Sequence, residues 1–115
     1  MNHCPEQSLD IEQRHLDMVC AILHRHVPEY AVWAFGSRVT GRARPYSDLD
    51  FAVITNAPLP FVVIGELGEA FSESDLPWRV DVVDWATTSA AFRRIIERDK
   101  VIMKLPEMGG CRRIG

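Results

Sequence analysis

The chain has 115 residues, of which 47% are hydrophobic and 25% are charged. This length suffices for one compact domain and is too short for two, and the composition excludes extended disorder, so we expect a single domain over residues 1–115 with its core at about 10–103. The 13 Lys and Arg against 16 Asp and Glu give a net charge of −3, which excludes recruitment of nucleic acid or anionic lipid by bulk attraction.

The first predicted elements are a helix and a buried strand. Asp10, with Gln13 three residues later, fits a capping box, and apolar residues then recur at helical spacing until the chain reaches Pro28. The short apolar run 31–35, which Gly36 ends, predicts a strand that is buried on both faces.

The middle of the chain predicts a loop, a second strand and a second long helix. Residues 36–47 are polar, basic and rich in turn formers, with room for one helical turn after Ser37. Residues 48–54 predict a strand, because the apolar run 51–54 follows two acids at its start. Apolar residues then recur at helical spacing over 61–71, and turn formers at 72–77 end this helix.

The last part of the chain predicts a third strand and a final helix. Residues 78–85 have β character, and the following helix can begin at any of three hydroxyl residues, Thr87, Thr88 and Ser89. Residues 101–103 form either a short final strand or an extended tail, and the residues after 106 are expected to fray. The alternation predicts an α/β fold with a small mixed sheet of about three strands and about four helices, whose strand order stays open.

Cysteine usage and hydropathy bear on the cellular compartment. Cys4, Cys20 and Cys111 are odd in number and widely spaced, which argues against a disulfide framework and against a cysteine-ligated zinc site. No stretch approaches the roughly 18 apolar residues of a membrane span, and residues 1–8 lack the apolar segment of a signal peptide. We therefore expect a cytoplasmic protein that does not associate with a membrane.

Two carboxylates mark the start of the second strand. Asp48 and Asp50 are two apart, so the period of a strand places both on one face and turns Leu49 to the other. Charges held so close repel each other unless a cation lies between them, and their hard oxygen atoms suit Mg²⁺. Alone, such a pair is more often two solvated acids at a strand end.

A Gly-Ser turn before these acids changes that interpretation. Gly36 permits close approach of the backbone to a ligand, and the Ser37 hydroxyl with neighbouring N–H groups can cradle a phosphate. Together the two clusters resemble the signature of the polymerase-beta-like nucleotidyltransferase superfamily, and in particular its small branch, the minimal nucleotidyltransferases. The residues that carry the resemblance are Phe35-Gly36-Ser37-Arg38, Gly41 and Ser47-Asp48-Leu49-Asp50.

The resemblance implies the nucleotidyltransferase fold and the transfer of a nucleotide from ATP, aided by Mg²⁺, with two ions expected. Asp48 and Asp50 would hold the metal ions. A third carboxylate is expected on a neighbouring strand, where Asp81 fits the family pattern better than Asp84. Because these two residues are three apart they face opposite sides, so at most one joins the site. Asp84 would then be a solvated residue at the strand end or at a helix entry.

The same resemblance implies where the nucleotide is bound. Gly36 and Ser37, with the adjoining N–H groups, would hold the β- and γ-phosphates, and Arg38 is the first choice for neutralising the triphosphate. Arg42 and Arg44 either share that task or belong to a solvated basic loop.

Other side chains are weaker candidates. Tyr46 and Trp85 are secondary candidates for contact with the nucleotide. Three histidines, His15, His24 and His26, fall on the first helix and are expected at its surface.

The acceptor of the nucleotide is expected on another protein. Larger relatives add a domain that holds the acceptor, and this chain has little length for one. The resemblance implies a helical HEPN-class toxin as the partner, with AMP moving from ATP to a tyrosine hydroxyl of the toxin and silencing it. Residues 61–64 carry more apolar surface than one helical stripe can bury, which places part of the partner contact there. Two alternatives stay open: a module that blocks its partner without catalysis, and transfer to a small-molecule hydroxyl.

Overall fold

Helices and strands alternate over residues 9–106, the part of the chain that the computed structural model describes. In chain order its elements are α1 (Gln13–His26), β1 (Ala31–Phe35), α2 (Ser37–Thr40), β2 (Leu49–Ile54), α3 (Phe61–Glu73), β3 (Val80–Asp84), the 3-10 helix η1 (Trp85–Thr87), α4 (Ala90–Asp99) and β4 (Val101–Lys104). The predicted α/β fold with four helices is confirmed, and the short helical turn after Ser37 is α2. The expected fraying after residue 106 lies outside the described residues, as do Cys4 and Cys111.

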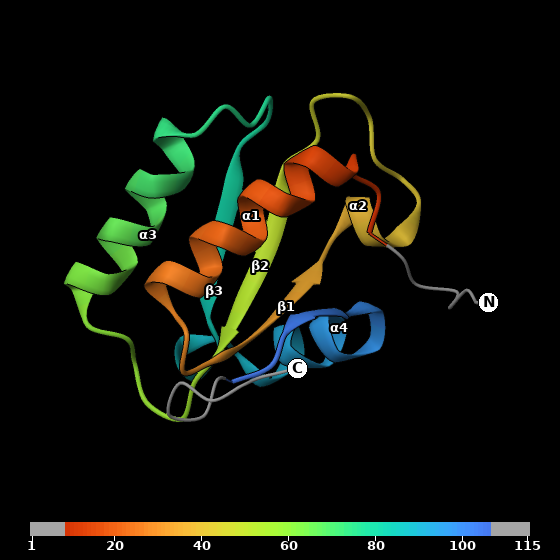
Figure 1. Ribbon diagram of the computed structural model, residues 1–115. Coiled ribbons are helices and arrows are strands. Elements are labelled where there is room, and N and C mark those ends of the chain that lie inside the picture. Colours follow the sequence, from red (N-terminus) through yellow and green to blue (C-terminus); the bar gives the residue numbers. More distant parts are fainter. Residues whose placement is uncertain (1–8, 107–115) are drawn as a thin grey trace.

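The strands form one mixed sheet in the order β3-β2-β1-β4 (Figure 1). β1 pairs antiparallel with β2 and with β4, and β2 pairs parallel with β3. Of the two alternatives for residues 101–103, the strand is therefore correct, and the sheet has four strands rather than about three. β1 and β2 are interior strands, which explains why their sequences are almost wholly apolar.

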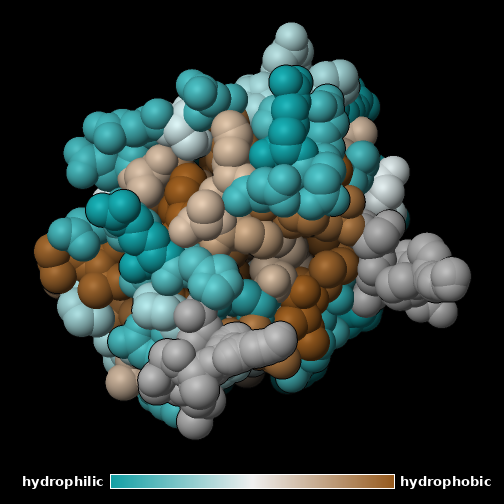
Figure 2. Space-filling view, viewed as in Figure 1, coloured by the Kyte–Doolittle hydropathy of each residue, from teal (hydrophilic) through white to brown (hydrophobic). Residues whose placement is uncertain are grey.

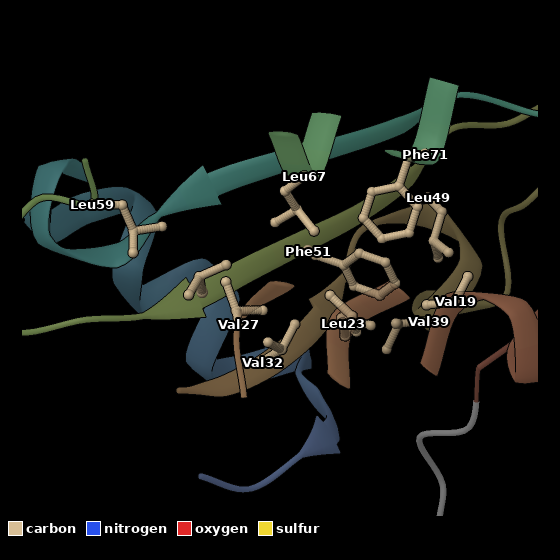
Figure 3. Packing of buried hydrophobic residues seen from close by; sticks show 12 residues of the cluster. Val19, Leu23, Val27, Val32, Val39, Leu49, Phe51, Leu59, Leu67 and Phe71 are labelled. Atoms are coloured by element: carbon tan, nitrogen blue, oxygen red, sulfur yellow. The ribbon is translucent and has the colours of Figure 1, made fainter. Parts of the chain in front are cut away.

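Two helical layers cover the two faces of this sheet. On one face α1 and α3 lie over a core in which Phe51 of β2 is fully buried between Leu23 of α1 and Leu67 of α3 (Figure 3). On the other face α4 packs through Ile96 against Phe35 and other residues of the interior strands. Truncation of a buried aromatic residue such as Phe51 to alanine typically costs about 3–5 kcal/mol. The sheet is thus a rigid platform for residues at its ends.

Helix ends follow local chemistry, with one departure from the expectation. Ser89 caps α4, because its side chain accepts a hydrogen bond from the Phe92 N–H. Asp10, in contrast, does not cap α1: the helix begins after Glu12, which makes no side-chain cap. The prediction of an Asp10 cap is wrong because the main chain of Asp10 pairs with Arg38 in both directions.

One of the three histidines of α1 also departs from expectation. His15 is buried and meets the Trp78 ring edge to face, with ring centroids 5.7 Å apart. The prediction of a surface histidine is wrong here because the segment before β3 folds back over the first turn of α1 and covers it. None of the helices within residues 9–106 is both long and apolar enough to cross a lipid bilayer.

Candidate active site

The sheet register aligns two acids across neighbouring strands. Asp50 of β2 pairs with Asp81 of β3, and Phe35 at the end of β1 pairs with Asp50 on its other side. The alternation of side chains puts Asp50 and Asp81 on the face that also carries α4. Asp48 lies just before β2, at the same end of the sheet. The structure thus places Asp48, Asp50 and Asp81 at the same end of the sheet.

The electrostatics of this cluster centre on Asp50. Burial, followed by the negative charges of Asp81 and Asp48, raises the pKa of Asp50 from its ordinary 3.8 to about 6. Asp50 is half-buried and Asp81 is exposed. A cation bound between these groups would relieve the repulsion and favour the ionised form of Asp50.

Gly36 closes the site over Asp50. Its φ of 90° lies in a region that side chains disfavour, and a Cβ atom built on it would overlap the Asp50 Oδ2 and lie 3.2 Å from the Cγ. Only glycine therefore lets the main chain pass this close to the acid. Ser37 follows as the first residue of α2, so its hydroxyl and the N–H groups of that turn lie at the same sheet end.

The carboxylates at this end of the sheet are the side chains that could hold Mg²⁺. Within residues 9–106, no three His, Cys, Asp or Glu side chains lie close enough to hold one metal ion jointly. Mg²⁺ is usually held by one or two carboxylates, with water and substrate phosphates completing its octahedral shell. The Asp50–Asp81 pair, with Asp48 within electrostatic reach, fits that pattern. The three-carboxylate ligand set stays a prediction.

Asp84, the alternative third acid, has a different environment. It is buried, and its carboxylate accepts hydrogen bonds from the Thr55 hydroxyl, from the Leu59 N–H at 2.7 Å and from the Ala86 N–H at 3.1 Å. The expectation of a solvated residue is wrong, whereas its position as a helix-entry residue is confirmed, since it caps η1. The pairing of Asp50 with Asp81 favours Asp81 as the acid of the site.

The basic residues of the loop differ in their environments. Arg38 is buried and donates hydrogen bonds to main-chain carbonyl groups, a role that sequence reasoning missed because main-chain acceptors leave no trace in the sequence. Arg42 and Arg44 are exposed. The Arg98 hydrogen bond lowers the pKa of Asp99, and the charge of Arg42 adds to this effect, which places Arg42 within electrostatic reach of the end of α4.

A pocket of about 500 Å³ adjoins Asp48 on the opposite side of the sheet, toward α3. Its wall includes Tyr46, which is 82% exposed, and Trp78. Trp85, the other aromatic candidate, packs edge to face on Trp33 with centroids 5.2 Å apart and lies under the guanidinium of Arg93. Of the two candidates, Tyr46 has the more accessible ring.

Comparison with known families decides the class of the protein. Residues 19–107 match the family model described as polymerase beta, nucleotidyltransferase. The chain belongs to the polymerase beta nucleotidyltransferase family. Within this family, a relative from Haemophilus influenzae, described as a probable protein adenylyltransferase MntA, is 57% identical over 99 residues, covering 86% of this chain and 87% of the relative.

Solved structures that are similar to this chain confirm the fold. A crystal structure described as a toxin-antitoxin with AMP-PNP aligns at a TM-score of 0.67 and 23% identity, covering 78% of this chain and 73% of the other. A tri-AMPylated Shewanella oneidensis HEPN toxin in complex with its MNT antitoxin contains a chain that aligns at a TM-score of 0.62 and 22% identity, covering 83% and 73%. At these identities the structures establish the nucleotidyltransferase fold of this chain.

Proposed function

We propose that this nucleotidyltransferase is a metal-dependent protein adenylyltransferase that moves AMP from ATP to a tyrosine hydroxyl of a HEPN-class toxin and so acts as its antitoxin. The observation that carries the proposal is the pairing of Asp50 with Asp81 beneath the Gly36-Ser37 turn. Two acids that repel each other, beside a turn that can receive phosphates, fit a cation-assisted reaction of a triphosphate. The 57% identity to a probable MntA supports the reaction class.

Each residue of the site has a proposed role. Bound Mg²⁺, with two ions expected, would neutralise the charge that grows on the attacking and leaving oxygens. Asp48, Asp50 and Asp81 would hold the metal ions through their carboxylate oxygens. Gly36 and Ser37 would receive the β- and γ-phosphates through the Ser37 hydroxyl and the N–H groups at the start of α2, which lie at the same sheet end as Asp50.

The reaction itself is a displacement at phosphorus. The acceptor hydroxyl attacks the α-phosphorus of ATP, a new oxygen–phosphorus bond forms, and pyrophosphate leaves with the electrons of the broken bond. Asp81 is the exposed acid of the pair and can accept the hydroxyl proton. Arg42 and Arg44 are exposed beside the site and can neutralise the leaving pyrophosphate.

The partner is proposed to bind partly at the beginning of α3. Phe61 is 92% exposed and Val62 is 63% exposed, whereas Val63 and Ile64 pack on the core, so the expected excess of apolar surface is confined to the first two positions. Figure 2 shows this apolar surface where α3 begins, at the left of the view. The proposed use of ATP supports the proposal of a cytoplasmic location.

Intact mass measurement of a HEPN-class partner tests the proposal. The partner is incubated with this chain, ATP and Mg²⁺, and we expect it to gain mass in whole AMP units on tyrosine. The Asp48→Asn, Asp50→Asn double variant is the control and should add none. Neutralisation of the toxin by that double variant, without any gain in mass, would instead favour blocking without catalysis.

A further inference from the structure

Arg38 has an environment that is unusual for an arginine near a phosphate site. Its exposed fraction is only 6%, and its guanidinium lies over the Trp78 ring with 4.7 Å from Cζ to the ring centroid. A side chain that grips a phosphate must present its N–H groups to the open site. Here those groups point into the protein.

Main-chain carbonyl groups of two segments accept hydrogen bonds from the Arg38 guanidinium. The Nε donates to the Ser47 oxygen at 2.9 Å, one Nη donates to the Asp10 oxygen at 3.1 Å, and the other donates to the Pro45 oxygen at 3.1 Å and the Arg44 oxygen at 3.4 Å. The main chain of Arg38 also accepts a hydrogen bond from the Asp10 N–H at 2.7 Å. One side chain thus ties the segment before α1 to the loop that leads into β2.

This loop ends at Asp48, whose two neighbours are both fixed. The Ser47 oxygen is held by Arg38, and the Leu49 N–H donates to the Arg79 oxygen at 2.9 Å. Ser47 is held a second time, because its Oγ accepts from the Arg44 N–H at 2.8 Å and closes the turn. The position of Asp48 relative to Asp50 therefore depends on Arg38 on one side and on the sheet on the other.

We propose that Arg38 is a positioning residue that sets the place of Asp48 through the main chain of residues 44–47, and that it does not contact the triphosphate. This inference rests on the proposed function for its catalytic consequence. A lysine keeps the charge but cannot replace the planar fork of donors that spans three carbonyl groups of the loop. It follows that charge alone does not preserve the role of Arg38.

Kinetics of Arg38→Lys and Arg38→Gln separate positioning from phosphate binding. Arg25→Gln is the matched control, because Arg25 is an exposed residue in the last turn of α1, at the opposite end of the sheet from Asp50. We expect both Arg38 variants to lose about 100-fold in kcat with KM for ATP changed by less than about threefold, since displacement of a reacting group by about 1 Å costs that much. Preserved kcat with a raised KM that lysine restores would overturn the proposal in favour of a phosphate ligand.

Two readouts without turnover complete the test. Amide hydrogen exchange should accelerate in residues 44–48 of both Arg38 variants while β1 keeps its protection, and Mn²⁺ should bind more weakly in the absence of ATP. If the native chain transfers no nucleotide, the proposed function fails, yet these two measurements still decide the positioning role. Unchanged exchange in this loop, or variants that do not fold by circular dichroism, would show that Arg38 does not specifically position Asp48.

Discussion

At the scale of single residues, two glycines share a strained main-chain conformation, but only one of them lies against the candidate site. Gly36 and Gly41 both have positive φ, 90° and 82°, but only a Cβ on Gly36 would meet Asp50, whereas nothing lies within 4 Å of a Cβ on Gly41. Gly41→Ala should therefore cost only the strain of the left-handed conformation, about 1 kcal/mol.

Gly36→Ala should add a second effect to the same strain. Because the new methyl group overlaps the Asp50 carboxylate, we expect the variant to lose nucleotide transfer and Mn²⁺ affinity, while Gly41→Ala retains both. Urea unfolding and a transfer assay on the two variants check this. Equal activity of both variants would mean that Gly36 does not shape the site.

The raised pKa of Asp50 predicts how stability depends on pH without metal. The folded state favours the protonated carboxyl of Asp50. Between the ordinary pKa of 3.8 and the raised pKa of about 6, the folded protein therefore binds more protons than the unfolded chain does. Stability should therefore fall as pH rises through that window. At about pH 7, Asp50→Asn should stabilise the chain by about 1–2 kcal/mol, a discounted value because solvent screens a half-exposed group, and near pH 4 it should change little. Urea unfolding at both pH values measures the difference.

At the scale of elements, side chains alternate between the two faces of β3, so that Asp81 and Asp84 lie on opposite faces of the sheet. Asp81 is exposed and lies beside Asp50, whereas the buried Asp84 receives donors from three residues. Asp81→Asn should abolish transfer without loss of stability. Asp84→Asn should destabilise the fold by about 1–3 kcal/mol, because the new amide group places a donor against donors. Thermal unfolding and transfer assays on both variants test the pair, and the reverse ranking would assign the site to Asp84.

The sequence predicts some ends of these helices and strands correctly and others wrongly. Strand period predicts that Asp48 and Asp50 stand at the start of a strand, and β2 begins there; Ser89, one of the three residues predicted to cap the last helix, caps α4. The Asp10 cap is wrong because α1 begins only after Glu12, and Asp10 lies outside the helix, where its main chain bonds with Arg38, 28 residues along the chain. Local patterns predict local bonds, but they carry no signal for a side chain that binds distant carbonyl groups.

At the scale of the whole molecule, the predicted class of fold is confirmed and the strand order comes only from the structure. The order β3-β2-β1-β4 places the three candidate acids and the Gly36-Ser37 turn at one end of the sheet. This order depends on contacts between residues far apart in sequence, which local periodicity does not encode.

The most direct test of the central claim follows the phosphorus atoms of ATP. A HEPN-class partner is incubated with this chain, Mg²⁺ and ATP labelled at either the α- or the γ-phosphate, with Asp81→Asn as the control. AMP transfer predicts that the α label becomes bound to the partner, that the γ label leaves with pyrophosphate, and that the variant transfers neither. A partner that carries the γ label, or that carries no label while being neutralised, would contradict adenylyl transfer by this site.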